Sequence, residues 1–71
     1  MPSPEDESRL ETVVDEIAQA GNAGLRSFEN ADGSWVVSIE NDDWSVVAEG
    51  PTRAKALSNL IANAKAEGRA S

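Results

Sequence analysis

The amino-acid sequence predicts an α+β domain with the element order α-β-β-β-α, in which two helices pack on one face of a three-stranded antiparallel sheet. Three observations predict it. Apolar residues recur at helical spacing near the N-terminus, residues 35–48 alternate like a β-hairpin, and Gly-Pro-Thr precedes a second helical pattern. A chain of 71 residues is close to the lower limit for one stable core. We therefore expect a polar segment at 1–8, one domain at 9–68 and a frayed tail at 69–71.

The first helix is predicted by a single apolar stripe with i, i+3, i+4, i+7 and i+8 spacing, formed by Leu10, Val13, Val14, Ile17 and Ala18. Ser3 and Pro4 suit an N-cap and a first helical residue, because the fixed φ of proline matches the first turn. A start about one turn later, after residue 7, fits the pattern equally well. Gly21 is the expected stop.

The first strand is predicted at residues 25–30, with Phe28 as its core residue. Ala31-Asp32-Gly33 has the composition of the turn that follows it. Strands at 35–40 and 43–49 then form a hairpin.

The hairpin has Asn41 and Asp42 as its two-residue turn in this interpretation. One face then holds only apolar cross-strand pairs, which are Trp35 with Ala48, Val37 with Val46 and Ile39 with Trp44. The other face is mainly polar, which predicts a sheet covered on one side and wet on the other.

The second helix follows Gly50-Pro51-Thr52, which ends the third strand and supplies a helix cap, and Gly68 ends the helix. Its apolar stripe is Leu57, Leu60, Ile61 and Ala64. The predicted core comprises Leu10, Val13, Val14, Ile17, Phe28, Trp35, Val37, Ile39, Trp44, Val46, Leu57, Leu60 and Ile61.

Composition excludes several functions. The chain has no cysteine and no histidine, so thiolate chemistry and the usual proton shuttle at neutral pH are both missing. The carboxylates show no pairing of the kind that acid–base catalysis needs. No apolar run approaches the length of a bilayer span, and the N-terminus is acidic where a signal peptide would be basic. We expect a cytoplasmic protein that is not an enzyme, needs no cofactor and does not contact membranes.

Charge is unevenly distributed. Residues 1–49 carry twelve acidic and two basic side chains, a net charge of −10, whereas residues 50–71 carry a net charge of +3, giving −7 in total. A negative field repels phosphate backbones and attracts basic partners. Surplus acid also keeps a small protein soluble without any further role. The candidate partner-binding residues are the acids of the first helix and the hairpin tip, namely Glu11, Asp15, Glu16, Glu40, Asp42 and Asp43.

Metal ions and nucleic acids fit the sequence less well than a basic protein does. The cluster at 40–43 suggests Ca²⁺, but it lacks the spacing of an EF-hand, and a polar turn explains it better. Trp35 and Trp44 are aromatic enough to stack on bases, yet their register places them in the core. The cations of the second helix fit a solvated helix face.

From Trp35 onward, the hairpin followed by Glu49-Gly50-Pro51-Thr52-Arg53 resembles the double-stranded-RNA-binding domain. That resemblance implies the α-β-β-β-α fold and a phosphate clamp at the start of the second helix. Only Arg53 is basic among the three matching positions, because the others are Ala54 and Leu57. The resemblance therefore implies the fold with a degenerate RNA-binding motif, for which the remaining candidates are Arg26, Arg53 and Lys55.

A second resemblance covers residues 25–66, where a strand, Asp-Gly-x-Trp, two strands, Gly-x-Thr and an Ala-Leu-rich helix resemble the N-terminal domain of HicB-type antitoxins. This sequence lacks the Pro- and Gly-rich segment between the later strands and the DNA-binding tail of that family. Three hypotheses follow: a binder or inhibitor of a basic protein, analogous to phage-encoded inhibitors; a degenerate RNA-binding module; and a HicB-like partner of a toxin. We expect a monomer or a weak homodimer.

Overall fold

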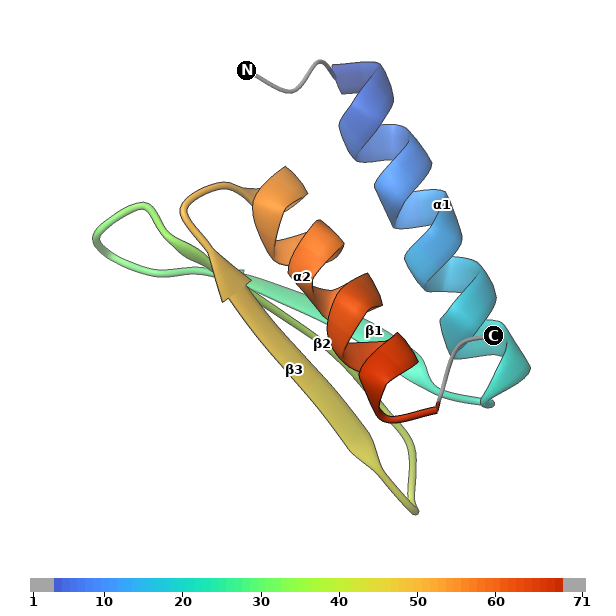
Figure 1. The fold of residues 1–71 in the computed structure, drawn as a ribbon. Helices are drawn as coiled ribbons and strands as arrows, with labels where there is room; N and C mark the ends of the chain where they lie inside the picture. The colour runs from blue at the N-terminus through green and yellow to red at the C-terminus, as the bar shows by residue number, and fades with distance from the viewer. Residues whose placement is uncertain (1–3, 69–71) are drawn as a thin grey trace.

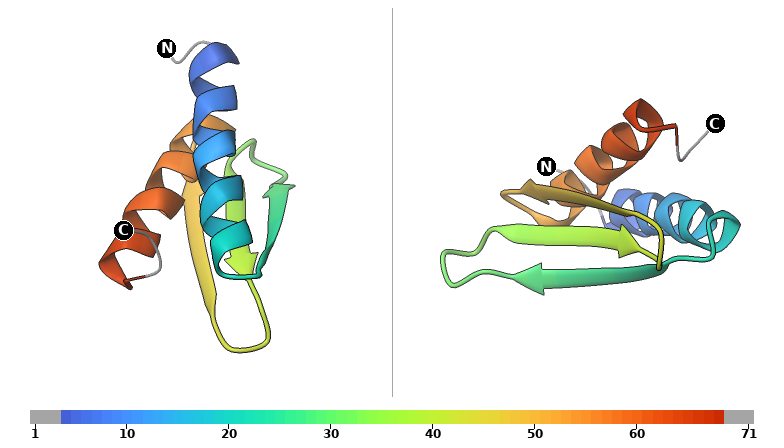
Figure 2. Two further views of the ribbon diagram at one scale, coloured as in Figure 1. Left: turned by 90° about the vertical axis from the view of Figure 1, so that its right-hand side faces the viewer. Right: turned by 90° about the horizontal axis from the view of Figure 1, so that it is seen from below.

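The computed structural model describes residues 4–68 and shows the predicted α+β class. Its elements are α1 (Pro4–Ala20), β1 (Gly24–Glu29), β2 (Trp35–Glu40), β3 (Ser45–Gly50) and α2 (Arg53–Ala66), as Figure 1 shows. The strands form one antiparallel sheet in the order β1-β2-β3. Both helices lie on the same side of this sheet (Figure 2). None of the helices in this described part is long and apolar enough to cross a membrane.

Helix α1 begins at Pro4, the earlier of the two predicted starts. The expected cap Ser3 and the expected tail at 69–71 lie outside the described residues. The helix ends before Gly21, as predicted, but the left-handed residue is Asn22, whose φ is 57°. Glycine is needed at position 21 for another reason, because a Cβ there would lie 2.5 Å from a carbon of the Trp44 ring.

The predicted hairpin register is wrong by two residues. Trp35 pairs with Gly50, Val37 pairs with Ala48 and Ile39 pairs with Val46. The connection is a four-residue loop, residues 41–44, in place of the predicted two-residue turn. It closes through a hydrogen bond from the Asn41 backbone N–H to the Trp44 carbonyl, 2.9 Å long. A shift of two keeps every side chain on its predicted face, because strand side chains alternate with a period of two.

Strand β1 begins one residue earlier than predicted, and its buried residue is different. Leu25 pairs with Ile39 and packs against the core, whereas Phe28 pairs with Val36 on the open face and is 57 % exposed. Phe28 is therefore not a core residue, contrary to the prediction. Strand β3 begins at Ser45, two residues later than predicted, because the loop uses the residues before it.

The core lies between the sheet and the two helices, with α2 across β2 and β3. Several predicted residues are only partly buried around it, among them both tryptophans, and Val13 lies outside the core cluster. Alanines contribute more than predicted, because α2 packs closely on the sheet. The fully or nearly fully buried residues are Val14, Ala18, Val37, Ile39, Val46, Ala48, Ala54, Ala56, Leu57, Leu60 and Ala64.

Helix α2 begins as predicted, with Thr52 as its N-cap accepting a hydrogen bond from the Lys55 backbone N–H. Its first turn lies directly against the end of β3. A Cβ at Gly50 would come within 2.7 Å of the Ala56 nitrogen, so only glycine fits there. At the other end, Gly68 has a φ of 77° and donates its N–H to the Lys65 carbonyl.

Candidate functional site

The acids of α1 form a ridge that is already partly occupied. Glu7, Glu11 and Asp15 follow one another at i, i+4 and i+8. Arg53, at the start of α2, lies 2.9 Å from Glu11 Oε2 and 3.3 Å from Glu7 Oε1. The hydrogen bond with Glu11 is the main reason why the pKa of Arg53 is raised. A predicted partner-binding acid and a predicted RNA-binding cation thus bind each other.

A second ion pair joins candidates on the open face of the sheet. Arg26 Nε lies 3.4 Å from Glu40 Oε1, and both side chains are largely exposed. Such an exposed pair contributes little to stability and leaves both groups accessible to a partner.

The three alternative RNA-binding residues do not form one patch. Arg26 points to the open face of the sheet, which is the side away from the helices. Arg53 and the exposed Lys55 lie in the first turn of α2 on the helical side. The structure therefore brings Arg53 next to acids and separates it from Arg26.

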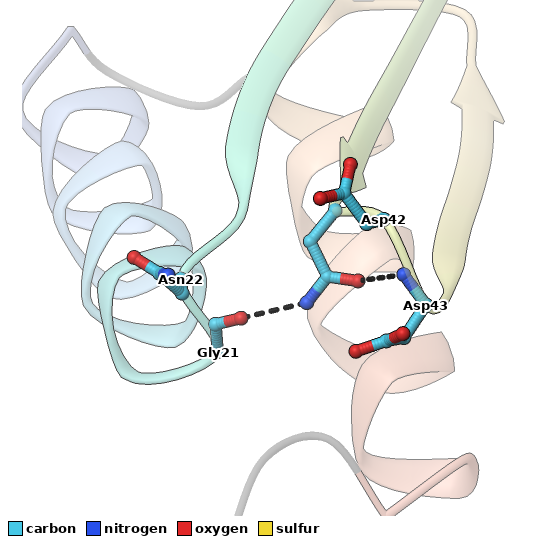
Figure 3. Close-up of a pocket in the computed structure, with 5 residues that line it drawn as sticks. Gly21, Asn22, Asp42 and Asp43 are labelled. Carbon is cyan, nitrogen blue, oxygen red and sulfur yellow. Dashed lines mark hydrogen bonds between the residues drawn. The ribbon is translucent and has the colours of Figure 1, made fainter.

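The hairpin tip and the end of α1 meet in an acidic hollow of about 230 Å³. It is lined by Gly21, Asn22, Asn41, Asp42 and Asp43 (Figure 3). We call these five residues the acidic hollow.

Asn41 holds the two sides of the hollow together. Its Nδ2 donates to the Gly21 carbonyl at 2.7 Å, which ties the loop to the end of α1. Its Oδ1 accepts from the backbone N–H groups of Asp43 at 2.8 Å and Trp44 at 2.9 Å. One side chain thus fixes the position of both neighbouring aspartates.

The hollow has two sources of negative potential. The C-terminal end of α1 carries the negative end of the helix dipole, and no basic residue lies in its last turn. Asp42 and Asp43 add two exposed carboxylates. These carboxylates point in different directions in Figure 3, and no group of acids among the described residues is arranged to hold a metal ion. The arrangement suits a cationic side chain, which donates hydrogen bonds in several directions.

The remaining candidates of α1 lie apart from Arg53. Asp15 is half-buried one turn beyond Glu11, and Glu16 is exposed. Neither takes part in an ion pair with another side chain of residues 7–68.

A second hollow, of about 350 Å³, lies between α1 and the start of α2. Its lining is mainly apolar and includes Leu10, Pro51 and Ala54. The sequence patterns gave no sign of it, because Leu10 comes from a part of the chain far from the other two residues.

The turn between β1 and β2 carries another structured acid. Asp32 Oδ1 accepts hydrogen bonds from the Ser34 hydroxyl at 2.7 Å and from the Ser34 N–H at 3.0 Å. These bonds, the hydroxyl first, lower the pKa of Asp32 below its usual value.

Sequence reasoning included Asp42 and Asp43 among the candidates but missed Gly21, Asn22 and the role of Asn41. A local signal existed for Asn41, because asparagine before a turn often bonds the backbone two residues on. Its bond to Gly21, twenty residues earlier, has no local signal.

No family model, curated protein or solved structure gives a significant match to this chain. The α-β-β-β-α topology is consistent with a fold like that of the double-stranded-RNA-binding domain.

Proposed function

We propose that this chain is a small, non-enzymatic interaction domain that binds a basic protein partner through its acidic surface, with the acidic hollow at the centre of the contact. The observation that carries the proposal is the geometry of the hollow. Asn41 holds Asp42 and Asp43 beside the uncompensated C-terminal end of α1. A lysine or arginine entering the hollow lies beside the negative end of the helix dipole, and the two exposed carboxylates add to the negative potential there.

The contact area extends from the hollow to the exposed acids nearby. Glu11 contributes less than the sequence alone suggests, because Arg53 already neutralises part of its charge. Charge complementarity of this kind mainly speeds association and selects partners. A role as an inhibitor that occupies a nucleic-acid-binding groove, in the cytoplasm, fits this chemistry.

The test uses the purified chain as bait in a lysate at low salt, with and without nuclease, followed by mass spectrometry and by titration of the captured protein. The variant Asp42→Asn/Asp43→Asn removes the two carboxylates but retains similar shape. Glu49→Gln/Glu67→Gln is the matched control, because it removes two exposed acids outside the hollow.

We expect a basic protein that is retained after nuclease treatment and that binds the Asp42/Asp43 variant about tenfold more weakly. The control variant should bind nearly as well as the wild-type chain. Equal weakening by both double variants would show that only total charge matters and would remove the hollow from the proposal.

Residual RNA binding is a second candidate function, because the topology is consistent with an RNA-binding fold. It rests on Arg26, Arg53 and Lys55. Binding to a double-stranded RNA would fall steeply with salt and be lost in Arg53→Glu. Absence of binding at low salt would eliminate it, and a toxin gene next to this one would favour the HicB-like interpretation instead.

A further inference from the structure

The two edges of the sheet differ in how they are protected. Residues 45, 47 and 49 of β3 direct their backbone groups away from β2, because the bonded pair Asn41–Trp44 fixes the alternation along this hairpin. Two of those outward carbonyls are occupied by α2. Asn59 Nδ2 donates to the Glu49 carbonyl at 2.8 Å, and Asn63 Nδ2 donates to the Val47 carbonyl at 3.1 Å.

The β1 edge has no such cover. The Asn30 N–H donates to the Ser34 carbonyl at 2.8 Å, and alternation from this pair leaves the backbone groups of Leu25, Ser27 and Glu29 pointing outward. None of these three residues forms a further hydrogen bond with residues 7–68. Figure 2 shows β1 as the outermost strand, on the side of the sheet away from α2. An edge with free backbone groups is a template for another strand.

The surroundings of this edge identify the strand that fits it. Phe28 is 57 % exposed on the open face, and a neighbouring strand would place side chains beside its ring. Acids lie at both ends of the edge. Glu29 and Asp32 are at the turn, and the acidic hollow follows the other end, where Gly24 pairs with Glu40.

A second copy of this chain fits the edge poorly. Antiparallel pairing of β1 with itself would bring the acidic end of one copy next to the acidic end of the other, and each chain carries a net charge of −7. A basic strand is attracted to this edge, because its cationic side chains reach the acids at both ends and can stack on the Phe28 ring.

We propose that the free edge of β1 accepts an extended, basic segment of the partner protein as a fourth strand of the sheet. This inference rests on the proposed function, because it assigns the basic partner a backbone conformation and a place. The backbone bonds provide affinity, and the acids and Phe28 select cationic side chains.

The test measures binding of a capped eight-residue peptide of alternating lysine and valine by calorimetry. A peptide of alternating lysine and proline is the matched probe, because it has the same charge but half of its backbone donors. The chain is compared with its variants Ser27→Pro and Ser45→Pro. Both remove an outward N–H from an edge strand, the first from β1 and the second from β3.

We expect the lysine–valine peptide to bind the wild-type chain and Ser45→Pro equally well, and to bind Ser27→Pro about tenfold more weakly. The lysine–proline peptide should bind the wild-type chain about tenfold more weakly than the lysine–valine peptide does. Hydrogen exchange should slow at the amides of Leu25, Ser27 and Glu29 and stay unchanged at Val47 and Glu49. Circular dichroism of both variants checks that they are folded.

Equal binding of the two peptides, or unchanged exchange at the β1 edge, would overturn strand addition while leaving an acidic surface that attracts cations. Absence of binding by the lysine–valine peptide would also overturn it. Loss of binding in Asp42→Asn/Asp43→Asn without any edge dependence would support the proposed function alone.

Discussion

At the scale of single residues, Asn41 has the largest structural effect in the acidic hollow. Its side chain is half-buried and makes three hydrogen bonds, one to the end of α1 and two within the β2–β3 loop. It therefore fixes both the loop conformation and the distance between the loop and the helix. The two aspartates that follow it are placed by their backbone, and their carboxylates remain exposed.

We expect Asn41→Ala to lower the free energy of unfolding by about 1–2 kcal/mol, because three partners lose a hydrogen bond and water replaces it only in part. Urea unfolding followed by tryptophan fluorescence measures this change. Asp42→Asn is the control, since it leaves the backbone bonds of the loop intact and should shift the midpoint little. An unchanged midpoint in Asn41→Ala would mean that the loop is held by its backbone alone.

At the scale of elements, the sequence predicted the five elements and their order because the apolar spacing differs clearly between helices and strands. It did not predict the hairpin register, since registers two residues apart place the same apolar side chains inward. The hydrogen bonds of Asn41 within the four-residue loop favour the observed register over the predicted one. Phe28 was misplaced for a related reason: in a six-residue edge strand, two apolar residues of opposite parity, Leu25 and Phe28, compete for the core, and hydrophobicity alone favours the larger one.

The candidate site was predictable only in its charge. Asp42 and Asp43 could be assigned to an exposed tip from their position between two strands. The end of α1 lies next to these aspartates because Trp44 packs against Gly21, which is a tertiary contact. The ion pairs that Arg53 forms with Glu11 and Glu7, here called the Arg53 clamp, were also missed. Arg53 lies 42 residues from Glu11 in the sequence, so no local pattern indicates the contact.

This clamp is the main polar link between α1 and α2, and a double-mutant cycle tests it. We expect Arg53→Met and Glu11→Gln to couple by about 0.5–1 kcal/mol, because the arginine is 22 % exposed but the carboxylates are more exposed and solvent screens them. Urea unfolding of the wild type and three variants gives the coupling.

The sign of the pH effect follows from the raised pKa of Arg53. Stability from a raised pKa is fully present below the pKa of the unfolded chain and is lost only as the pH rises through the pKa of the folded chain. Arg53 therefore stays protonated between about pH 6 and pH 10, and the coupling energy between Arg53 and Glu11 should stay constant over this range. A coupling of zero at low salt would show that the helices are held by apolar packing alone.

At the scale of the whole molecule, the net charge of −7 acts on a small surface. Residues 7–68 hold three ion-pair contacts, and two of them share Arg53. Most acids in this part of the chain therefore have no ion-pair partner, and repulsion among them opposes folding. The same repulsion favours binding of a basic partner, because the partner relieves it. Stability and recognition thus depend on one property of the surface.

Salt should consequently stabilise this chain. Screening at about 0.5 M NaCl shortens the range of repulsion to a few ångströms, and a gain of about 1 kcal/mol would raise the melting temperature by roughly 4–8 °C for a domain of this size. Thermal unfolding followed by circular dichroism at about 0.02 M and 0.5 M NaCl measures the shift. The less negative variant Glu49→Gln/Glu67→Gln should show a smaller rise, which separates screening from general salt effects on apolar burial. A melting temperature that falls with salt would mean that the Arg53 clamp outweighs the repulsion of all the other acids.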